Sequence, residues 1–274
     1  MMSGMSGGSR AADLTFVKLG GSLITDKSEA YTARFDVIDR LAAEVREALD
    51  AEPGRRVLLG HGSGSFGHWA AEPYATQAGV RTEAEWRGYA EVAAAAARLN
   101  RLVTDAFLKA RVPTLSFQPS ASVVCHDGAV KHLNLRPIRE ALAHGLVPLI
   151  YGDVALDDIR GGTIASTEDL FVYLADALRP SRILLLSRVP GVLDDDSEVV
   201  PMITPDSYAG WRHALSGSDG VDVTGGMLDK VAQMIDLVGR HPDARVQIMT
   251  GCEPGLLTRA LLGKDEDAGT LISG

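Results

Sequence analysis

The chain has 274 residues, 46% hydrophobic and 23% charged, so it is long enough to bury the core of a globular enzyme. A formal net charge of −9 with no run of lysine or arginine argues against a nucleic-acid partner. Cys125 and Cys252 lack metal-ligand spacing and no apolar run could span a membrane, so we expect a cytoplasmic protein without a zinc site or membrane insertion.

Residues 1–13 lack the apolar segment of a signal peptide and are expected to form a flexible leader. From residue 14 onward, strand-like apolar runs alternate with segments of helical spacing. Strands are expected at 14–18, 56–60, 112–117, 146–151, 182–187 and 245–250, helices at 33–50, 84–110, 135–144, 167–178 and 226–240, and a hairpin at 153–164. This alternation predicts an α/β fold with a mostly parallel sheet covered on both faces. We expect one domain, 14–274, with two lobes at about 14–165 and 166–274.

The glycines of residues 62–67 match the spacing of a dinucleotide-binding fingerprint. That fingerprint needs a long helix after the glycines and then a strand that ends in an acidic residue. Pro73 and Gly79 interrupt any such helix, and the acidic residues at the right distance, Glu83 and Glu85, begin a helix instead. Dinucleotide binding therefore stays a minor alternative.

The glycine-rich turns at residues 20–22 and 62–64 each follow a predicted strand, and another glycine pair opens the helix at 226–240. Glycine lets backbone N–H groups approach phosphate oxygens closely, and a helix N-terminus favours an anion. If these turns converge at one end of a sheet, they would hold a chain of phosphates.

Lysine positions support the same interpretation, because only six of the 27 basic residues are lysine. Lys18 ends an apolar strand, where an unpaired ammonium would be costly unless it faced an anion. Lys230 lies in the first turns of its helix, and Lys27 follows the first glycine turn. The alternative is that these are solvated surface lysines, and it is strongest for Lys27.

Taken together, these segments resemble the amino acid kinase superfamily and, within it, the isopentenyl phosphate kinases. The matching stretches are VKLGGSLITDK (17–27), HGSGSFGH (61–68), QPSAS (118–122), VPLIYGDVALD (147–157), PGVLD (190–194) and DVTGGMLDK (222–230). They occur in the family's order and span nearly the whole chain after residue 13.

The resemblance implies a three-layer αβα sandwich with an open sheet, a homodimer, and a reaction between ATP with Mg²⁺ and an isoprenoid monophosphate. It implies an N-terminal lobe for the acceptor and a C-terminal lobe for the nucleotide. The catalytic set would be Lys18, Lys27, His68 and Lys230. The ATP-binding set would be Lys18, Gly20, Gly21, Ser22, Ser187, Gly191, Gly226 and Lys230. The acceptor-binding set would be Gly62, Ser63, Gly64, Gly67, His68, Gly152 and Asp153, and Glu168 would organise the lysines.

Two segments depart from the family pattern. Residues 166–169, Ser-Thr-Glu-Asp, stand where relatives often have Ser-Gly-Asp, so Glu168 is one methylene longer than the usual carboxylate. Residues 187–191, Ser-Arg-Val-Pro-Gly, replace a more usual Thr-Asp-Val-Asp-Gly. Both changes bear on how the nucleotide is contacted.

A phosphate acceptor is already an anionic nucleophile, so no general base is expected, and Mg²⁺ would be held mainly by ATP oxygens. His68 could instead cap its loop. Four aromatic residues after it could wall an apolar pocket or pack in the core: Trp69, Tyr74, Trp86 and Tyr89. Open alternatives for function are a kinase of the same fold acting on fosfomycin, UMP or an amino-acid carboxylate, and a non-catalytic nucleotide-binding module.

Overall fold

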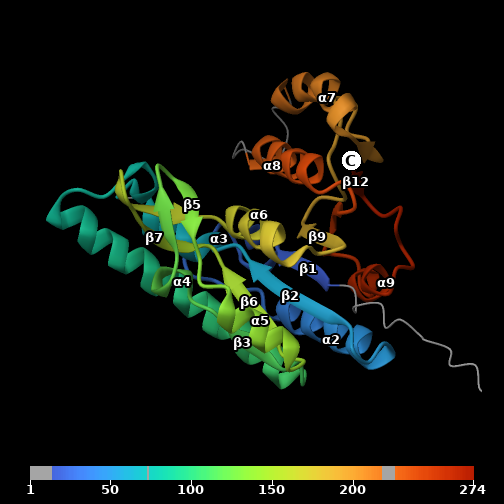
Figure 1. Ribbon diagram of the computed structural model, residues 1–274, viewed down its shortest axis with the longest axis horizontal. Helices are drawn as coiled ribbons and strands as arrows, with labels where there is room; N and C mark the ends of the chain where they lie inside the picture. Colours follow the sequence, from blue (N-terminus) through green and yellow to red (C-terminus); the bar gives the residue numbers. More distant parts are fainter. Residues whose placement is uncertain (1–13, 73, 218–225) are drawn as a thin grey trace, which may run out of the picture.

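The computed structural model describes residues 14–72, 74–217 and 226–274 (Figure 1). The leader expected at 1–13 and part of the stretch at 222–230 lie outside the described residues. The strands are β1 (Leu14–Leu19), β2 (Arg56–His61), β3 (Thr114–Ser116), β4 (Val124–His126), β5 (Ala129–His132), β6 (Val147–Tyr151), β7 (Asp153–Asp157), β8 (Gly161–Ala165), β9 (Arg182–Ser187), β10 (Met202–Ile203), β11 (Arg245–Thr250) and β12 (Thr270–Ile272).

Helices follow many of these strands along the chain and pack on both faces of the main sheet. They are α1 (Gly21–Ile24), α2 (Phe35–Ala51), α3 (Gly64–Ala71), α4 (Glu83–Lys109), α5 (Arg136–Ala143), α6 (Thr167–Leu178), α7 (Pro205–Gly217), α8 (Gly226–Arg240) and α9 (Leu256–Leu261). Each strand and helix expected from the sequence is present within a few residues of its expected bounds. In the parts of the chain that the structure describes, no helix is long and apolar enough to cross a membrane.

Among the described residues, the main sheet has eight strands in the order β10-β12-β11-β9-β1-β2-β6-β3. All neighbouring pairs are parallel except β11 with β12. Residues 14–165 and 166–274 share this sheet, because β9 pairs directly with β1. A smaller sheet, β5-β4-β7-β8, contains the expected hairpin as β7 and β8.

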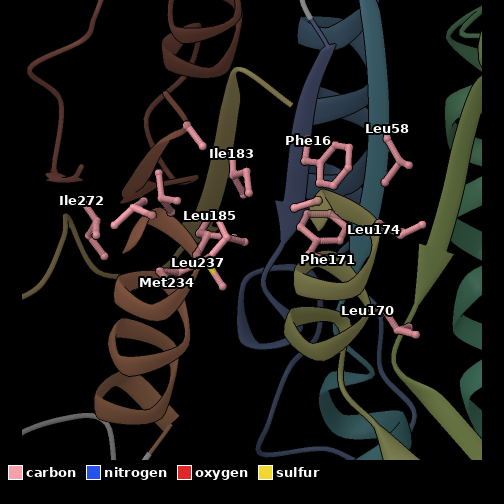
Figure 2. Packing of buried hydrophobic residues seen from close by; sticks show 14 of the residues in the cluster. Phe16, Leu58, Leu170, Phe171, Leu174, Ile183, Leu185, Met234, Leu237 and Ile272 are labelled. Carbon is pink, nitrogen blue, oxygen red and sulfur yellow. The ribbon is translucent and has the colours of Figure 1, made fainter. Parts of the chain in front are cut away.

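Helices cover both faces of the main sheet, which confirms the expected three-layer αβα architecture. One buried apolar cluster joins the sheet to α5, α6 and α8, and the other joins it to α2, α4 and α9. Figure 2 shows the first cluster, in which Phe16 of β1 lies against Phe171 of α6 with ring centroids 5.1 Å apart. In Figure 1, α2 and α4 lie on the side of the strands away from α6.

The glycine-rich segments are more helical than the sequence suggested. Gly64 begins α3, so His68 lies on a helix and not at the end of a loop. Phe66 and Ala70 are both buried, and their four-residue spacing places them on one face of this helix. The helix forms because that face packs against the core, which is a tertiary effect, and it ends at Ala71, before the interrupting residues Pro73 and Gly79.

Candidate active site

A cavity of about 790 Å³ lies at the carboxyl ends of β1, β2 and β9, beside α3 and α8. The carboxyl edge of a parallel sheet is where ligands bind in open α/β folds. Of the residues expected in the site, the cavity is lined by Lys18, Gly20, Gly21, Ser22, Lys27, Gly62, Gly64, His68, Glu168, Ser187 and Lys230. Segments far apart in the sequence therefore meet at one cavity, including the glycine turns after β1 and β2 and the three lysines.

Strand periodicity positions Lys18. Alternate residues of a strand share a face, so Lys18 points to the same side of β1 as Phe16. Phe16 packs on Phe171 of α6, and Glu168 lies one turn before Phe171 on that helix. The Lys18 Nζ atom is consequently 2.9 Å from Glu168 Oε1, and both side chains are buried.

Glu168 carries a negative charge because cations surround it. Burial pushes the pKa of Glu168 upward, but the charges of Lys18 and Lys230, together with hydrogen bonds from Lys18 and from the Glu168 backbone, make the net shift downward. The residue also lies in the first turn of α6, where the helix dipole favours an anion. Glu168 is thus a fixed anion that holds Lys18 at the cavity wall and attracts Lys230.

Glycine is required where the two N-terminal turns touch. A Cβ atom on Gly21 would lie 2.5 Å from the Gly64 nitrogen, and one on Gly62 would lie 2.9 Å from the Gly21 nitrogen. Gly64 also has a φ of 50°, which side chains rarely adopt. The glycines therefore bring the turn after β1 into backbone contact with the turn after β2.

Two of the amides expected to face phosphate are already used inside the fold. The Gly20 N–H donates to the Leu186 carbonyl, and the Gly62 N–H donates to the Leu19 carbonyl. At these two positions the structure indicates a packing role, in which glycine keeps the turns close to the sheet. Phosphate contacts would then come from neighbouring amides and from side chains.

His68 is exposed on α3 and lines the cavity. Within the described residues its ring makes no hydrogen bond, and the N-cap of α3, Ser63, receives no side-chain cap bond. The loop-capping alternative therefore has no contact to support it.

Several expected site residues lie away from the cavity wall. Ser63 and Gly67 pack on each other, since a Cβ atom on Gly67 would lie 2.1 Å from Ser63 Oγ. Gly191 is buried against Thr270 of β12. Gly226 is the first residue of α8, whose second turn carries Lys230.

Asp153 is a buried residue of β7, and Gly152 precedes it. The Asp153 carboxylate accepts hydrogen bonds from the backbone N–H groups of Ser120 and Val154 at 3.1 and 2.8 Å. Burial raises its pKa, although these hydrogen bonds lower it in part. In the structure Asp153 fastens the segment around Ser120 to the small sheet.

Some cavity residues were not in the expected site sets, although Arg188 and Val189 lie in the segment 187–191 that departs from the family pattern. Arg188 follows β9 directly, is exposed, and lines the cavity. The signal for it was its place after a strand of the parallel sheet, next to Ser187. Other lining residues that were not foreseen are Ser65, Leu185, Leu186, Val189, Met227 and Ile248.

The aromatic residues after His68 do not line this cavity. Tyr89 packs beside the buried cluster Ala70, Val92, Ala95 and Val154, and its ring contacts Trp86 at 5.3 Å between centroids. Trp69 is exposed, and the Tyr74 hydroxyl donates to Glu91.

His61, at the end of β2, forms a buried polar contact behind the cavity. Its ring lies 3.0 Å from the Gly62 carbonyl and 3.3 Å from the Asn100 side-chain oxygen, and it stacks on Tyr151. Burial lowers the pKa of His61 to about 4, so the ring is neutral near pH 7.

Because of this shift, we expect His61 to make stability depend on pH. Between about pH 6.5 and 4 the unfolded chain binds the proton more readily, so the free energy of unfolding falls as pH falls. His61 should account for about 2 kcal/mol of the loss between pH 7 and pH 5. Urea unfolding of the protein and of His61→Gln at both pH values measures this, and an equal pH dependence in the two proteins would contradict it.

Comparison with known proteins places this geometry in context. The family model for the amino acid kinase family matches residues 13–249. Isopentenyl phosphate kinase from Haloferax volcanii is 39% identical over 90% of this chain and 98% of its own length. The enzyme of that name from Methanocaldococcus jannaschii is 34% identical over 92% of this chain and 96% of its own length. A crystal structure of isopentenyl phosphate kinase superposes with a TM-score of 0.80 at 30% identity, covering 95% of this chain and 100% of the other.

Proposed function

The chain belongs to the amino acid kinase family, and we propose that it transfers the γ-phosphoryl group of ATP to isopentenyl phosphate, forming isopentenyl diphosphate. The observation that carries this proposal is the convergence of Lys18, Lys27, Lys230 and His68 on one cavity at the carboxyl edge of the sheet. The names and near-complete coverage of the relatives support the choice of acceptor.

The reaction needs charge stabilisation and alignment more than proton transfer. An oxygen of the acceptor phosphate forms a bond to the γ-phosphorus of ATP, the bond from that phosphorus to the bridging oxygen breaks, and ADP leaves. Since the acceptor is anionic, the main obstacle is repulsion between two phosphates, which the cavity cations offset. We assign Lys18 and Lys230 to the transferring group, and Lys27 and His68 to the acceptor phosphate.

Glu168 has a positioning role in this scheme. It contacts Lys18 directly, so the Lys18 ammonium group is held before substrates arrive, and its negative charge acts on Lys230 as well. Among the described residues, no group of three or more His, Cys, Asp or Glu side chains is placed to hold a metal ion. We propose that Mg²⁺ enters with ATP, bound to the phosphate oxygens of the nucleotide.

The remaining assignments follow the family resemblance. We propose that residues 14–165 form the acceptor lobe and 166–274 the nucleotide lobe. We also propose that the protein is a cytoplasmic homodimer.

An acceptor comparison tests the proposed function. With ATP and Mg²⁺, ADP release by the purified protein should be fastest with isopentenyl phosphate among isopentenyl phosphate, dimethylallyl phosphate, UMP, fosfomycin and glutamate. A kcat/KM tenfold or more higher for UMP or fosfomycin than for isopentenyl phosphate would contradict the acceptor assignment. ATP binding with no ADP release for any acceptor would instead indicate a non-catalytic nucleotide-binding module.

A further inference from the structure

Lys27 lines the cavity and lies in a short segment, residues 26–32, here called the Lys27 strap. The ends of the strap are fixed by backbone contacts. Thr25 and Ala33 form an antiparallel bridge, and the Asp26 N–H donates to the Thr32 carbonyl at 2.9 Å. Lys27 itself is exposed and lines the cavity. Its position therefore depends on what holds the middle of the strap.

Tyr31 of the strap has an unusual backbone conformation. Its φ is 56°, in the left-handed region that bulky side chains rarely occupy. Such strain persists only where surrounding contacts impose it, and it gathers at functional sites. A glycine would take this φ without strain. The backbone conformation would favour glycine at position 31, so the contacts of the side chain must explain why the residue is a tyrosine.

The Tyr31 ring joins the strap to two helices. It meets Phe66 of α3 edge to face, with centroids 5.7 Å apart and an interplanar angle of 81°. The Arg98 guanidinium of α4 lies 5.0 Å from the Tyr31 centroid, in cation–π range. Phe66 is buried and lies two residues before His68 on α3. A single ring thus connects the strap that carries Lys27 to the helix that carries His68.

We propose that Tyr31 is a positioning residue that fixes the Lys27 strap against the His68 helix, and so sets the width of the acceptor-phosphate site. This inference rests on the proposed function, in which Lys27 and His68 bind that phosphate. The Phe66 and Arg98 contacts offset the backbone strain at Tyr31, so the ring adds little to the stability of the fold. Its main effect is on the position of the Lys27 strap.

Substitution by glycine separates the positioning role from a structural one. In Tyr31→Gly the backbone strain disappears and the ring contacts are lost, so the melting temperature should change by less than about 3 °C. The KM for isopentenyl phosphate should rise roughly tenfold, while the KM for ATP stays within about twofold, because only acceptor contacts are displaced. Tyr31→Phe keeps both ring contacts and should behave as the unaltered protein.

Two further variants sharpen the test. Arg98→Met removes one of the two ring contacts and should raise the acceptor KM by a few fold in the same direction. Phe35→Ala is the matched control, because Phe35 is an exposed aromatic four residues after Tyr31 and makes no ring contact within the described residues. Its kinetics should be unchanged.

A measurement that needs no acceptor can test this inference even if the proposed function is wrong. Amide hydrogen exchange of residues 26–32 should be at least about tenfold faster in Tyr31→Gly than in Tyr31→Phe, even if isopentenyl phosphate proves to be the wrong acceptor. Unchanged exchange with unchanged kinetics in Tyr31→Gly would overturn the positioning role. A large fall in melting temperature with equal rises in both KM values would also overturn it, in favour of a purely structural role.

Discussion

Lys18→Met is expected to lower kcat by about 10²-fold or more, with a smaller rise in the KM for ATP. The reason is that negative charge shifts among the phosphate oxygens during transfer, and a fixed cation at the cavity wall stabilises that change more than it stabilises bound substrate. Lys230→Met should show the same pattern. Initial rates over a matrix of ATP and acceptor concentrations give kcat and both KM values. A variant with unaltered kcat would show that its lysine takes no part in transfer.

The Lys18 variant needs a matched control, because Lys18 and Glu168 form a buried ion pair. Removing one partner leaves an uncompensated buried charge, which commonly costs about 3–5 kcal/mol of stability. The double variant Lys18→Met/Glu168→Gln removes both charges and should recover most of the lost stability. If Lys18 acts on the transferring phosphate, kcat stays low in the double variant. Recovery of kcat together with stability would mean that Lys18 serves only to neutralise Glu168.

The same ion pair shows how far the sequence could be interpreted. An apolar strand ending in lysine required an anion. The residues alone pointed to a ligand as that anion, and the family resemblance added Glu168 as the residue that organises the lysines. In the structure the first anion that Lys18 meets is Glu168, 150 positions later in the chain. Local periodicity predicts β1 and α6 separately, but the pairing depends on Phe16 packing against Phe171. That contact is tertiary, and no pattern within either segment indicates it.

Elements with strong periodicity were predictable, whereas α3, α7, α9 and the short strands β10 and β12 were not expected from the sequence. Residues 64–71 form a helix because Phe66 and Ala70 are buried, a reason that only the folded chain supplies. The left-handed Tyr31 and the cavity position of Arg188 have no sequence signal comparable to a glycine turn. The sequence therefore indicated the cations and glycines of the cavity and, through the family resemblance, Glu168, but not the packing contacts that hold them in place.

His68→Ala is expected to lower kcat/KM for isopentenyl phosphate by roughly 10- to 150-fold while ATP affinity barely changes. That range corresponds to the loss of a charge-assisted hydrogen bond of about 1.5–3 kcal/mol to the acceptor phosphate. His68→Gln should keep more activity than His68→Ala, because its amide can still donate one hydrogen bond. The melting temperature should stay the same in both variants, since the ring is exposed and bonds to no other described residue.

The exposed His132 of β5, outside the cavity lining, provides the control, and His132→Ala should leave both kinetics and stability unchanged. Affinities for ATP and for isopentenyl phosphate, measured by calorimetry on the same variants, separate the two possible roles of His68. A phosphate ligand affects acceptor binding alone, whereas a residue that supports α3 would weaken both substrates and lower the melting temperature. Unchanged acceptor kinetics in His68→Ala would exclude the phosphate-binding role.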